Sequence, residues 1–452
     1  MPIQIEESET MLSRRIHIFA LAFLLIASVV TRADKIDDYV KAEMERQHVP
    51  GVSIVVVKDM KIIKTAGYGL ANVELNVPAT PETVYKIGSV SKQFIATGIM
   101  LLVQEGRISL GDPVSKFLDG TPDTWKAITV RHLLTHTSGI VREAPGFDPL
   151  KIQNDADVIK TAYSLPLHFS PGDKYEYCNV GYFTLAEIIR KVTGKSWADY
   201  LNESIFARLQ MNATRTTNVT DLVLNRASGY VWTKGKLQNA DIYFALRPSG
   251  AFLSTVVDLA KWDAALYSDK ILKQSALEQM WTPAKLNNGT TSNYGFGWSV
   301  DTVGGHREIH HGGSLPGFRS ELARFVDDKL TVVVLTNGDN AIAGLFALNV
   351  ANFYIQGLLP RHVVAKINPK VLDAYAGQYQ SPLITITREG DKLMMQTSED
   401  EEKMQLLPES ATDFFTRETS RTTYSFIKDD TGQAYLVVKF EGKETGRAKK
   451  IK

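Results

Sequence analysis

The stretch "YKIGSVSKQFIATGIM", residues 85–100, places two serines just ahead of a lysine at the start of an apolar run. The apolar spacing predicts a helix that begins here. In its first turn Ser89 and Lys92, three residues apart, share a face, so the amine lies within reach of the hydroxyl. A desolvated lysine can take the proton of a serine and make it a nucleophile. The alternative is an ordinary helix start, because Ser caps helices and the same spacing recurs at Ser425 and Lys428.

A second candidate is the tyrosine–asparagine pair in "YEYCNVGYF", residues 175–183, which precedes a predicted helix. On a loop, the side chains of Tyr177 and Asn179 can face a cleft. The tyrosine hydroxyl could relay a proton of the nucleophile, and the amide could orient a substrate carbonyl. The alternative is that Tyr177 belongs to the core and Asn179 caps a helix, since Tyr200 and Asn202 repeat the spacing inside a predicted helix.

The third candidate is "EIHHGGSLPGFRSE", residues 308–321, where two histidines precede two glycines and a predicted strand. Glycines let a backbone approach a ligand closely, and an N–H at a strand edge can supply half of an oxyanion hole. Paired histidines also suggest a metal, but no further ligand recurs nearby at metal-site spacing, so we predict no metal site. The alternative is a glycine-rich hairpin turn with solvated histidines.

Length and composition describe a globular chain with more than one domain. At 452 residues the chain exceeds the usual size of one hydrophobic core. Lys and Arg total 51 against 50 for Asp and Glu, so no basic surface is expected and nucleic acid is not predicted as a partner. Cys178 is the one cysteine, which excludes an intrachain disulfide and a cysteine-rich metal site.

The N-terminal segment is typical of a secretory signal peptide, which we place at residues 1–33. Arg14 and Arg15 precede an apolar run from Ile16 to Val30, and small residues follow. We therefore expect an exported protein, periplasmic or secreted, with no lasting membrane span after the signal is removed. A retained anchor is the weaker interpretation, because the run is short for a bilayer core of about 30 Å. Translation from Met11 is an alternative start.

The pattern along the chain predicts a large mixed domain over 34–360 and a small β-rich domain over 370–452. A helix at 35–48 and two strands near 51–69 open the first domain, its middle is mostly helical, and two strands near 318–337 and a helix at 341–357 close it. Strands from both ends would pair, which gives a sheet flanked by helices. In the tail, short β-like runs such as "ITITREG" and "AYLVVKF" predominate.

The three motifs Ser-x-x-Lys, Tyr-x-Asn and His-x-Gly, in this order and at these separations, resemble those of the serine β-lactamase and penicillin-binding-protein superfamily. The similarity is greatest to its branch of class C β-lactamases, esterases and D-aminopeptidases. Other segments agree with this resemblance: "ITVRHLLTHTSGI" (128–140), "FSPGDKYEYCNVGYFTLAEIIRKVTG" (169–194), "SGAFLSTVVDLAKW" (249–262), "YGFGW" (294–298) and "HGGSLPGFRS" (311–320).

The resemblance implies an α/β (α+β) fold of the β-lactamase/transpeptidase type, with an antiparallel sheet flanked by helices and a helical subdomain whose junction with the sheet holds the active site. The tail resembles a lipocalin-like β-barrel domain. The site residues carried over by motif position are the acylated nucleophile Ser89, its base Lys92, a second proton carrier Tyr177, a substrate-orienting amide Asn179, the third motif at His311 and Gly313, and an oxyanion hole from the N–H groups of Ser89 and Ser314. Ser91, beside Lys92, would point elsewhere on a helix and serve packing or capping.

A departure from the family pattern bears on the substrate. Many β-lactamases and transpeptidases carry a lysine in the third motif, where the cation helps to hold a carboxylate, whereas this chain has His311, largely neutral near pH 7. The resemblance then favours cleavage of amides or esters of small peptides, D-amino-acid derivatives or simple esters, without a cofactor. The alternatives are a β-lactamase in the narrow sense and a slowly acylated protein that binds penicillin or cell-wall peptides.

Overall fold

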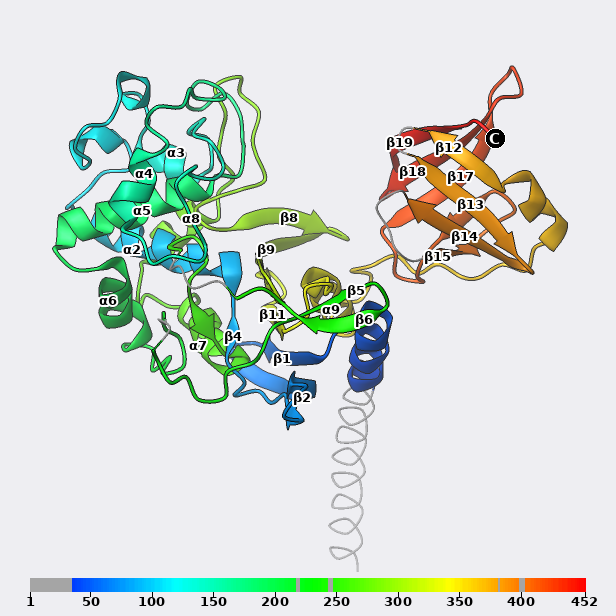
Figure 1. Cartoon of the computed structure of the whole chain (residues 1–452), viewed down its shortest axis with the longest axis horizontal. Coiled ribbons are helices and arrows are strands. Elements are labelled where there is room, and N and C mark those ends of the chain that lie inside the picture. The colour runs from blue at the N-terminus through cyan, green and yellow to red at the C-terminus, as the bar shows by residue number, and fades with distance from the viewer. Residues whose placement is uncertain (1–34, 217–219, 243–246, 381–382, 398–402) are drawn as a thin grey trace, which may run out of the picture. The chain divides into compact units, whose positions relative to one another are not determined.

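The structure is a computed structural model, and it describes residues 35–216, 220–242, 247–380, 383–397 and 403–452. The described residues divide into two compact units, one that runs up to Thr302 and also holds His306–Tyr354, and one of Val303–Gly305 with Ile355–Lys452 (Figure 1). The predicted signal peptide lies outside the described residues. The two units are described separately below.

A seven-stranded sheet forms the centre of the first unit. Its strand order is β3-β2-β1-β11-β10-β9-β8. The strands are β1 (Gly51–Lys58), β2 (Lys61–Asn72), β3 (Val77–Pro78), β8 (Ser299–Val303), β9 (His306–Leu315), β10 (Phe318–Phe325) and β11 (Leu330–Thr336). As predicted, strands from the two ends of the domain pair, and Val55 of β1 lies opposite Val333 of β11. Both of these central strands are buried along nearly their whole length, as expected where both faces are covered by helices.

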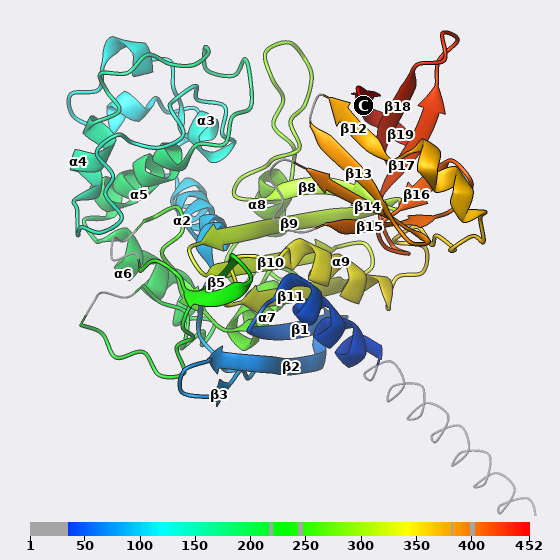
Figure 2. The same cartoon turned by 45° about the vertical axis from the view of Figure 1, so that its right-hand side comes forward.

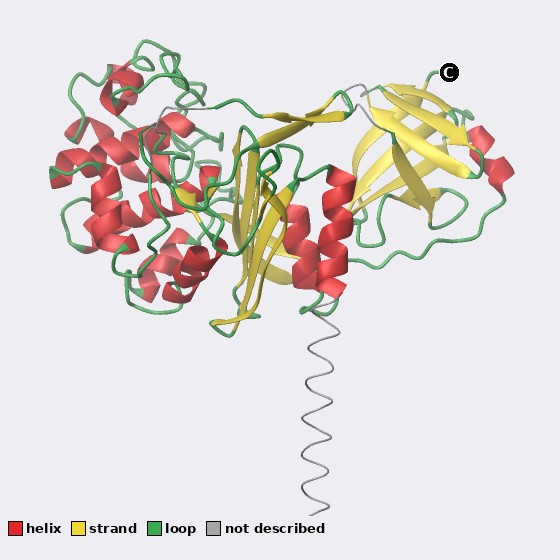
Figure 3. Ribbon diagram, turned by 60° about the horizontal axis from the view of Figure 1, so that its bottom comes forward, coloured by secondary structure: helices red, strands yellow, loops and turns green. Residues whose placement is uncertain are grey.

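Helices cover both faces of this sheet (Figures 2 and 3). Residues 35–47 are helical, as predicted, and lie with α9 (Ala343–Asn352) on one face, where α9 packs on β10 and β11. On the other face α7 (Val256–Ala265) packs on β1 and β11 and brings Trp262 into the core that holds Val55 and Val333. The predicted sheet flanked by helices is therefore confirmed.

A helical subdomain lies on the face of the sheet that α7 covers (Figure 1). Its helices are α2 (Lys92–Gln104), α3 (Val130–Leu134), α4 (Asp155–Lys160), α5 (Asn179–Thr193), α6 (Trp197–Leu201) and α8 (Gln274–Met280), with a short β pair of β4 (Tyr85–Lys86) and β7 (Leu253–Ser254). A second pair, β5 (Tyr230–Thr233) with β6 (Lys236–Asn239), lies instead beside the end of the N-terminal helix, where Trp232 stacks on His48. The central helix α2 is buried from Lys92 to Leu102 and packs on α5 and α6. Within the described part of the chain, no helix is both long and apolar enough to span a bilayer.

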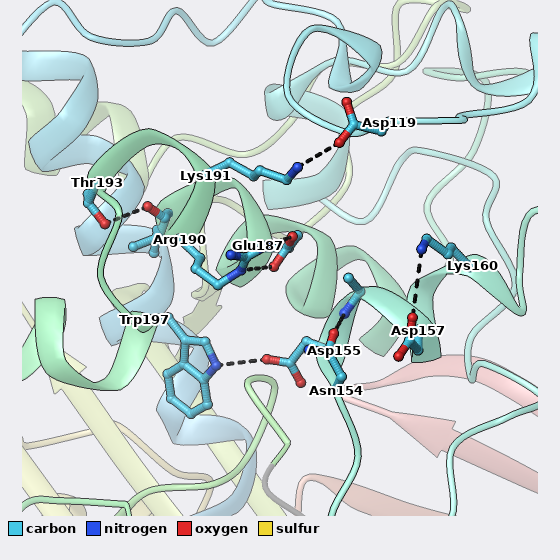
Figure 4. A network of polar contacts seen from close by, with 12 residues as sticks. Asp119, Asn154, Asp155, Asp157, Lys160, Glu187, Arg190, Lys191, Thr193 and Trp197 are labelled. Atoms are coloured by element: carbon cyan, nitrogen blue, oxygen red, sulfur yellow. Dashed lines mark hydrogen bonds and ion pairs between the residues drawn. The ribbon is translucent and has the colours of Figure 1, made fainter.

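Polar contacts gather on α4, α5 and α6, and one of them joins α6 to α4 (Figure 4). The indole Nε1 of Trp197 donates to Asp155 Oδ2 at 2.9 Å, and Arg190 forms two hydrogen bonds with the buried Glu187. Burial raises the pKa of Asp155 to about 6, with the nearby Glu187 adding to this rise and the bond from Trp197 opposing it. The network thus contains an acid that is more easily protonated in the folded chain than in the unfolded one.

The second unit is a closed barrel of eight antiparallel strands, which confirms the predicted small β-barrel-like domain. The strands are β12 (Gly377–Gln380), β13 (Ile384–Glu389), β14 (Lys392–Thr397), β15 (Met404–Pro408), β16 (Asp413–Phe415), β17 (Thr422–Lys428), β18 (Ala434–Phe440) and β19 (Lys443–Lys450), preceded by the short helix η5 (Pro369–Ala374). The second Ser-x-x-Lys lies in β17, where Ser425 Oγ donates to Asp413. In this setting the motif joins neighbouring strands.

We predict that Asp155→Asn removes a pH-dependent loss of stability. Because folding raises the pKa of Asp155, the side chain contributes to the stability of the fold while it is protonated, below about pH 4. This stabilising contribution is lost as the pH rises to about 6. At pH 7 the asparagine variant should therefore gain up to about 2 to 3 kcal/mol relative to wild type, and much less at pH 4. Urea titrations followed by circular dichroism at the two pH values measure this difference.

The matched control is Asp157→Asn on the same helix, where the side chain is exposed and contacts Lys160 at 3.7 Å. This variant should shift stability little, and equally at both pH values. An Asp155→Asn effect that does not change between pH 4 and pH 7 would contradict the assignment of the raised pKa to Asp155.

Candidate active site

The nucleophile candidate Ser89 sits in a single 3₁₀ turn, Gly88–Ser91, from which α2 continues. Gly88 has a positive φ of 51°, and a Cβ on it would lie 2.7 Å from the backbone nitrogen of Ser314. Glycine is required because this conformation and this close approach both exclude a side chain. The turn is therefore pressed against β9 at the point where Ser314 lies.

The amine of Lys92 is completely buried and has three polar contacts. Nζ lies 2.9 Å from Ser89 Oγ, 2.9 Å from Asn179 Oδ1 and 2.8 Å from the carbonyl oxygen of Ser249. The amide of Asn179 is fixed in this orientation because its Nδ2 donates to the carboxylate of Glu143. Asn179 Oδ1 and the Ser249 carbonyl can only accept hydrogen bonds, whereas the serine hydroxyl can also donate.

These contacts suit a neutral lysine. A neutral amine has two N–H groups, which reach Asn179 and Ser249, and one lone pair, which remains for the hydroxyl proton of Ser89. Burial lowers the pKa of Lys92 well below its usual 10.5, and the cationic Arg247 adds to this effect. Lys92 is therefore positioned and tuned to accept a proton from Ser89.

Tyr177 lies close to both Lys92 and Ser89. Its ring centroid is 4.7 Å from Lys92 Nζ, and burial raises the pKa of its hydroxyl, an effect that a hydrogen bond with Ser89 opposes. The buried ring of His136 packs against Tyr177 with centroids 4.2 Å apart and accepts a hydrogen bond from the Cys178 backbone nitrogen at 3.1 Å. His136 thus holds the Tyr-x-Asn segment in place through its ring contact with Tyr177 and its hydrogen bond with the backbone of Cys178.

Cys178 caps the helix that follows Tyr177. Its Sγ accepts from Gly181 N at 3.3 Å at the start of α5 and lies 3.2 Å from the carbonyl oxygen of Val141, to which the thiol can donate. Burial raises the pKa of the thiol to about 12, so the group is a neutral thiol. The alternative that Asn179 caps this helix is wrong, because the cap is Cys178 and the Asn179 amide faces Lys92.

His311 is buried and neutral. Its Nδ1 lies 2.6 Å from the carbonyl oxygen of Gly312, an acceptor, so Nδ1 carries the proton and Nε2 accepts from the hydroxyl of Tyr294 at 2.8 Å. Burial lowers the pKa of His311 to about 3. The alternative of solvated histidines is wrong for this residue, and the third motif presents no cation at neutral pH.

The backbone of β9 reaches the nucleophile turn at Gly313. A Cβ on Gly313 would overlap the carbonyl oxygen of Ile87, and the same carbonyl accepts a hydrogen bond from Ser320 Oγ at 2.8 Å. Ser314 follows at once on the strand and borders the same cavity as Ser89. This arrangement brings the backbone of the third motif beside the first motif.

The structure therefore places all seven predicted site residues in one region of the first unit. Ser89, Tyr177, His311, Gly313 and Ser314 line a cavity of about 420 Å³, and Lys92 and Asn179 lie beneath it. Ser91 is not part of this cavity, since its hydroxyl is buried and accepts from Phe252 N at 3.2 Å. Among the described residues no cluster of three or more His, Cys, Asp or Glu side chains is arranged to hold a metal.

Sequence reasoning did not single out several neighbours of this site. His136, Glu143 and Tyr294 contact the predicted residues directly, and Arg142 lines the cavity. The segments that contain His136 and Tyr294 agree with the family pattern, but this agreement indicated no role for the two residues. The acid and the arginine carry no local pattern that would mark them.

Comparison with known proteins gives the family of the chain. The family model described as "Beta-lactamase" matches residues 36–353, which is well over half of the chain. The chain belongs to the beta-lactamase family. Residues 361–452 match a second model, described as "Domain of unknown function (DUF3471)".

The proteins that the chain is similar to include penicillin-binding proteins and a D-amino acid amidase. Penicillin-binding protein 4* of Bacillus subtilis is 28% identical over 417 residues, which cover 85% of this chain and 92% of the relative. An octameric penicillin-binding protein homologue from Pyrococcus abyssi is 26% identical, with a TM-score of 0.66 over 92% of this chain and 100% of that chain. D-amino acid amidase from Ochrobactrum anthropi SV3 is 26% identical, with a TM-score of 0.60 over 71% of this chain and 96% of that chain. The chain is accordingly a serine hydrolase of this family.

We predict that Gly313→Ala disables the site, because its new methyl group would overlap the Ile87 carbonyl and separate β9 from the nucleophile turn. Loss of one oxyanion donor costs about 10²–10³ in rate, so ester turnover should fall by at least about a hundredfold. Gly250→Ala is the matched control, since a Cβ there meets the Gly88 backbone at an ordinary 3.4 Å. Ester turnover by Gly313→Ala within twofold of wild type would contradict the packing described here.

Proposed function

We propose that the protein is an exported serine hydrolase that is acylated at Ser89 and cleaves amide or ester bonds of small peptides, D-amino-acid derivatives or esters. The observation that carries this proposal is the hydrogen-bond contact between Ser89 Oγ and the buried amine of Lys92 at 2.9 Å. Export is supported by the basic and apolar N-terminal segment alone.

In the acylation step, the lone pair of Lys92 takes the proton of Ser89 while Oγ attacks the substrate carbonyl carbon. The carbonyl oxygen gains negative charge, which the N–H groups of Ser89 and Ser314 would stabilise without reorganising. When the tetrahedral intermediate collapses, the bond to the leaving group breaks, and the leaving nitrogen or oxygen receives the proton through Tyr177. The products are the released amine or alcohol and an ester at Ser89.

In the deacylation step, water replaces the leaving group. The Lys92 and Tyr177 pair takes a proton from water, the hydroxide attacks the Ser89 ester, and the acid is released while Oγ recovers its proton. Asn179 holds Lys92 through its Oδ1, and its amide is itself held by Glu143. The amide of Asn179 therefore serves mainly to orient the base.

The neutral His311 favours amides and esters over β-lactams. In many β-lactamases a lysine in the third motif helps to hold the substrate carboxylate, but here the ring is neutral and its Nε2 is occupied by Tyr294. The names of two relatives, a D-amino acid amidase and a penicillin-binding protein, fit both amide hydrolysis and slow acylation by penicillin.

The test incubates the chain with a nitrophenyl ester, a D-alanine anilide and a chromogenic cephalosporin, and follows turnover and the intact mass. Ester or anilide turnover should fall at least a thousandfold in Ser89→Ala, together with loss of the acyl adduct. Ser425→Ala, in the second Ser-x-x-Lys, is the matched control and should keep both. Turnover that survives in Ser89→Ala would refute the mechanism.

Two other outcomes would replace the proposed substrate class. Cephalosporin turnover that exceeds ester and anilide turnover would indicate a β-lactamase in the narrow sense. A stable adduct at Ser89 without turnover would indicate a slowly acylated binding protein.

A further inference from the structure

The cavity at Ser89 continues along the sheet to the start of α9. Its walls include Ser89 and Tyr177 at one end, and Glu321 of β10 with residues 341–344 at the other. β10 and α9 pack directly on each other (Figure 2). The part of the cavity beyond Ser89 is therefore built by elements that the catalytic motifs do not include.

The ionised side chains that line the cavity differ between its two ends. Arg142 lies beside the nucleophile, with its guanidinium 5.3 Å from the Tyr177 ring centroid. Arg319 also borders the cavity, but it forms an ion pair with Asp339 and donates to the carbonyl oxygens of Leu315 and Phe318. Arg319 is thus held by these partners, and Glu321 is the acidic residue in the cavity lining.

Glu321 belongs to a small network of ionised side chains. Its Oε1 lies 2.9 Å from His310 Nδ1, and His310 Nε2 lies 3.0 Å from Asp301 Oδ2. Although burial alone would lower the pKa of His310, these two carboxylates raise it well above 6.5, so the ring is an imidazolium at neutral pH. His310 thus pairs with Oε1 of Glu321 and makes no such contact with Oε2.

Two glycines lie beside the second carboxylate oxygen of Glu321. A Cβ on Gly312 would lie 3.0 Å from Oε2, and a Cβ on Gly344 would lie 3.3 Å from it. Any larger residue at either position would crowd this oxygen. The Glu321 side chain is only 9% exposed, so a charge that reaches Oε2 would interact with it in a largely desolvated environment.

We propose that the Glu321 end of the cavity is a subsite for a protonated amine of the substrate, such as the ammonium group of a peptide or of a diamino acid. This inference rests on the proposed function, because it assigns a substrate class to the same site. An ammonium group there would pair with Oε2, whereas a carboxylate would be repelled. The apolar side chains of Ala341, Ile342 and Ala343 in the same wall suit the methylene stem of such a group.

The experiment compares nitrophenyl esters of equal length whose acyl chain ends in an ammonium, a carboxylate or a methyl group, and a second set with these groups on the leaving alcohol. Wild type should prefer the ammonium over the carboxylate by about tenfold or more in kcat/KM in one of the sets. Glu321→Gln, which keeps the shape and the acceptor for His310, should lower this preference about tenfold and leave the methyl-ended substrate within about twofold.

Asp301→Asn is the matched control, because it removes the same charge from the far side of His310 and does not line the cavity. It should lower the preference less than Glu321→Gln does. Equal preferences in wild type and Glu321→Gln would overturn the subsite. An equal loss of activity on the ammonium-ended, carboxylate-ended and methyl-ended esters would also overturn it, because such a loss indicates a structural role for Glu321.

Failure of the proposed function would be recognised separately. It would appear as turnover of the methyl-ended ester that survives Ser89→Ala, or as no turnover by wild type. In that case, calorimetry of the ammonium-ended and carboxylate-ended amides with the Ser89→Ala chain tests the subsite without catalysis. Tighter binding of the ammonium-ended amide, lost in Ser89→Ala combined with Glu321→Gln, would support the subsite, and equal binding of the two amides would overturn it.

Discussion

The burial of one lysine amine is the constraint on which the site depends. An unpaired ammonium in a dry interior costs several kcal/mol, so a lysine in such a place loses its proton. Lys92 meets this condition, and its neighbours are arranged for the neutral amine: two pure acceptors take its N–H groups, and the Ser89 hydroxyl faces its lone pair. Elsewhere, burial of a lysine would only destabilise the fold. Here it lowers the pKa of Lys92 and so provides a base.

The packing of the domain serves to hold this arrangement. The first turn before α2 is pressed against β9 because Gly88 and Gly313 carry no side chains, and Ser320 holds the Ile87 carbonyl between them. From the helical side, His136 and Cys178 fix the segment that carries Tyr177. The junction between sheet and helical subdomain is therefore where rigid backbone elements from distant parts of the chain meet, and rigid elements can aim donors and bases without reorganisation.

How much of the fold and of the site could be predicted depends on how far apart in the sequence the interacting residues lie. Ser89 and Lys92 lie within one turn, and the central strands read as apolar runs, so a short window of sequence contains their geometry. The Nε2 of His311 meets Tyr294, and the Glu321 carboxylate lies beside glycines 9 and 23 residues away, and only the folded chain brings these residues together. In the barrel, β15 and β16 have five and three residues, too few to show an alternating pattern.

The most direct measurement of the central claim is an NMR titration of the chain labelled with ¹³C at lysine Cε, with the Lys92 signal assigned from its loss in Lys92→Arg. If the buried amine is the base, its Cε resonance titrates well below pH 10.5, the usual pKa of a lysine, and the neutral form is present at the pH where the enzyme works. A Lys92 resonance that keeps the shift of a charged amine up to pH 10 would contradict the assignment of Lys92 as the base that activates Ser89.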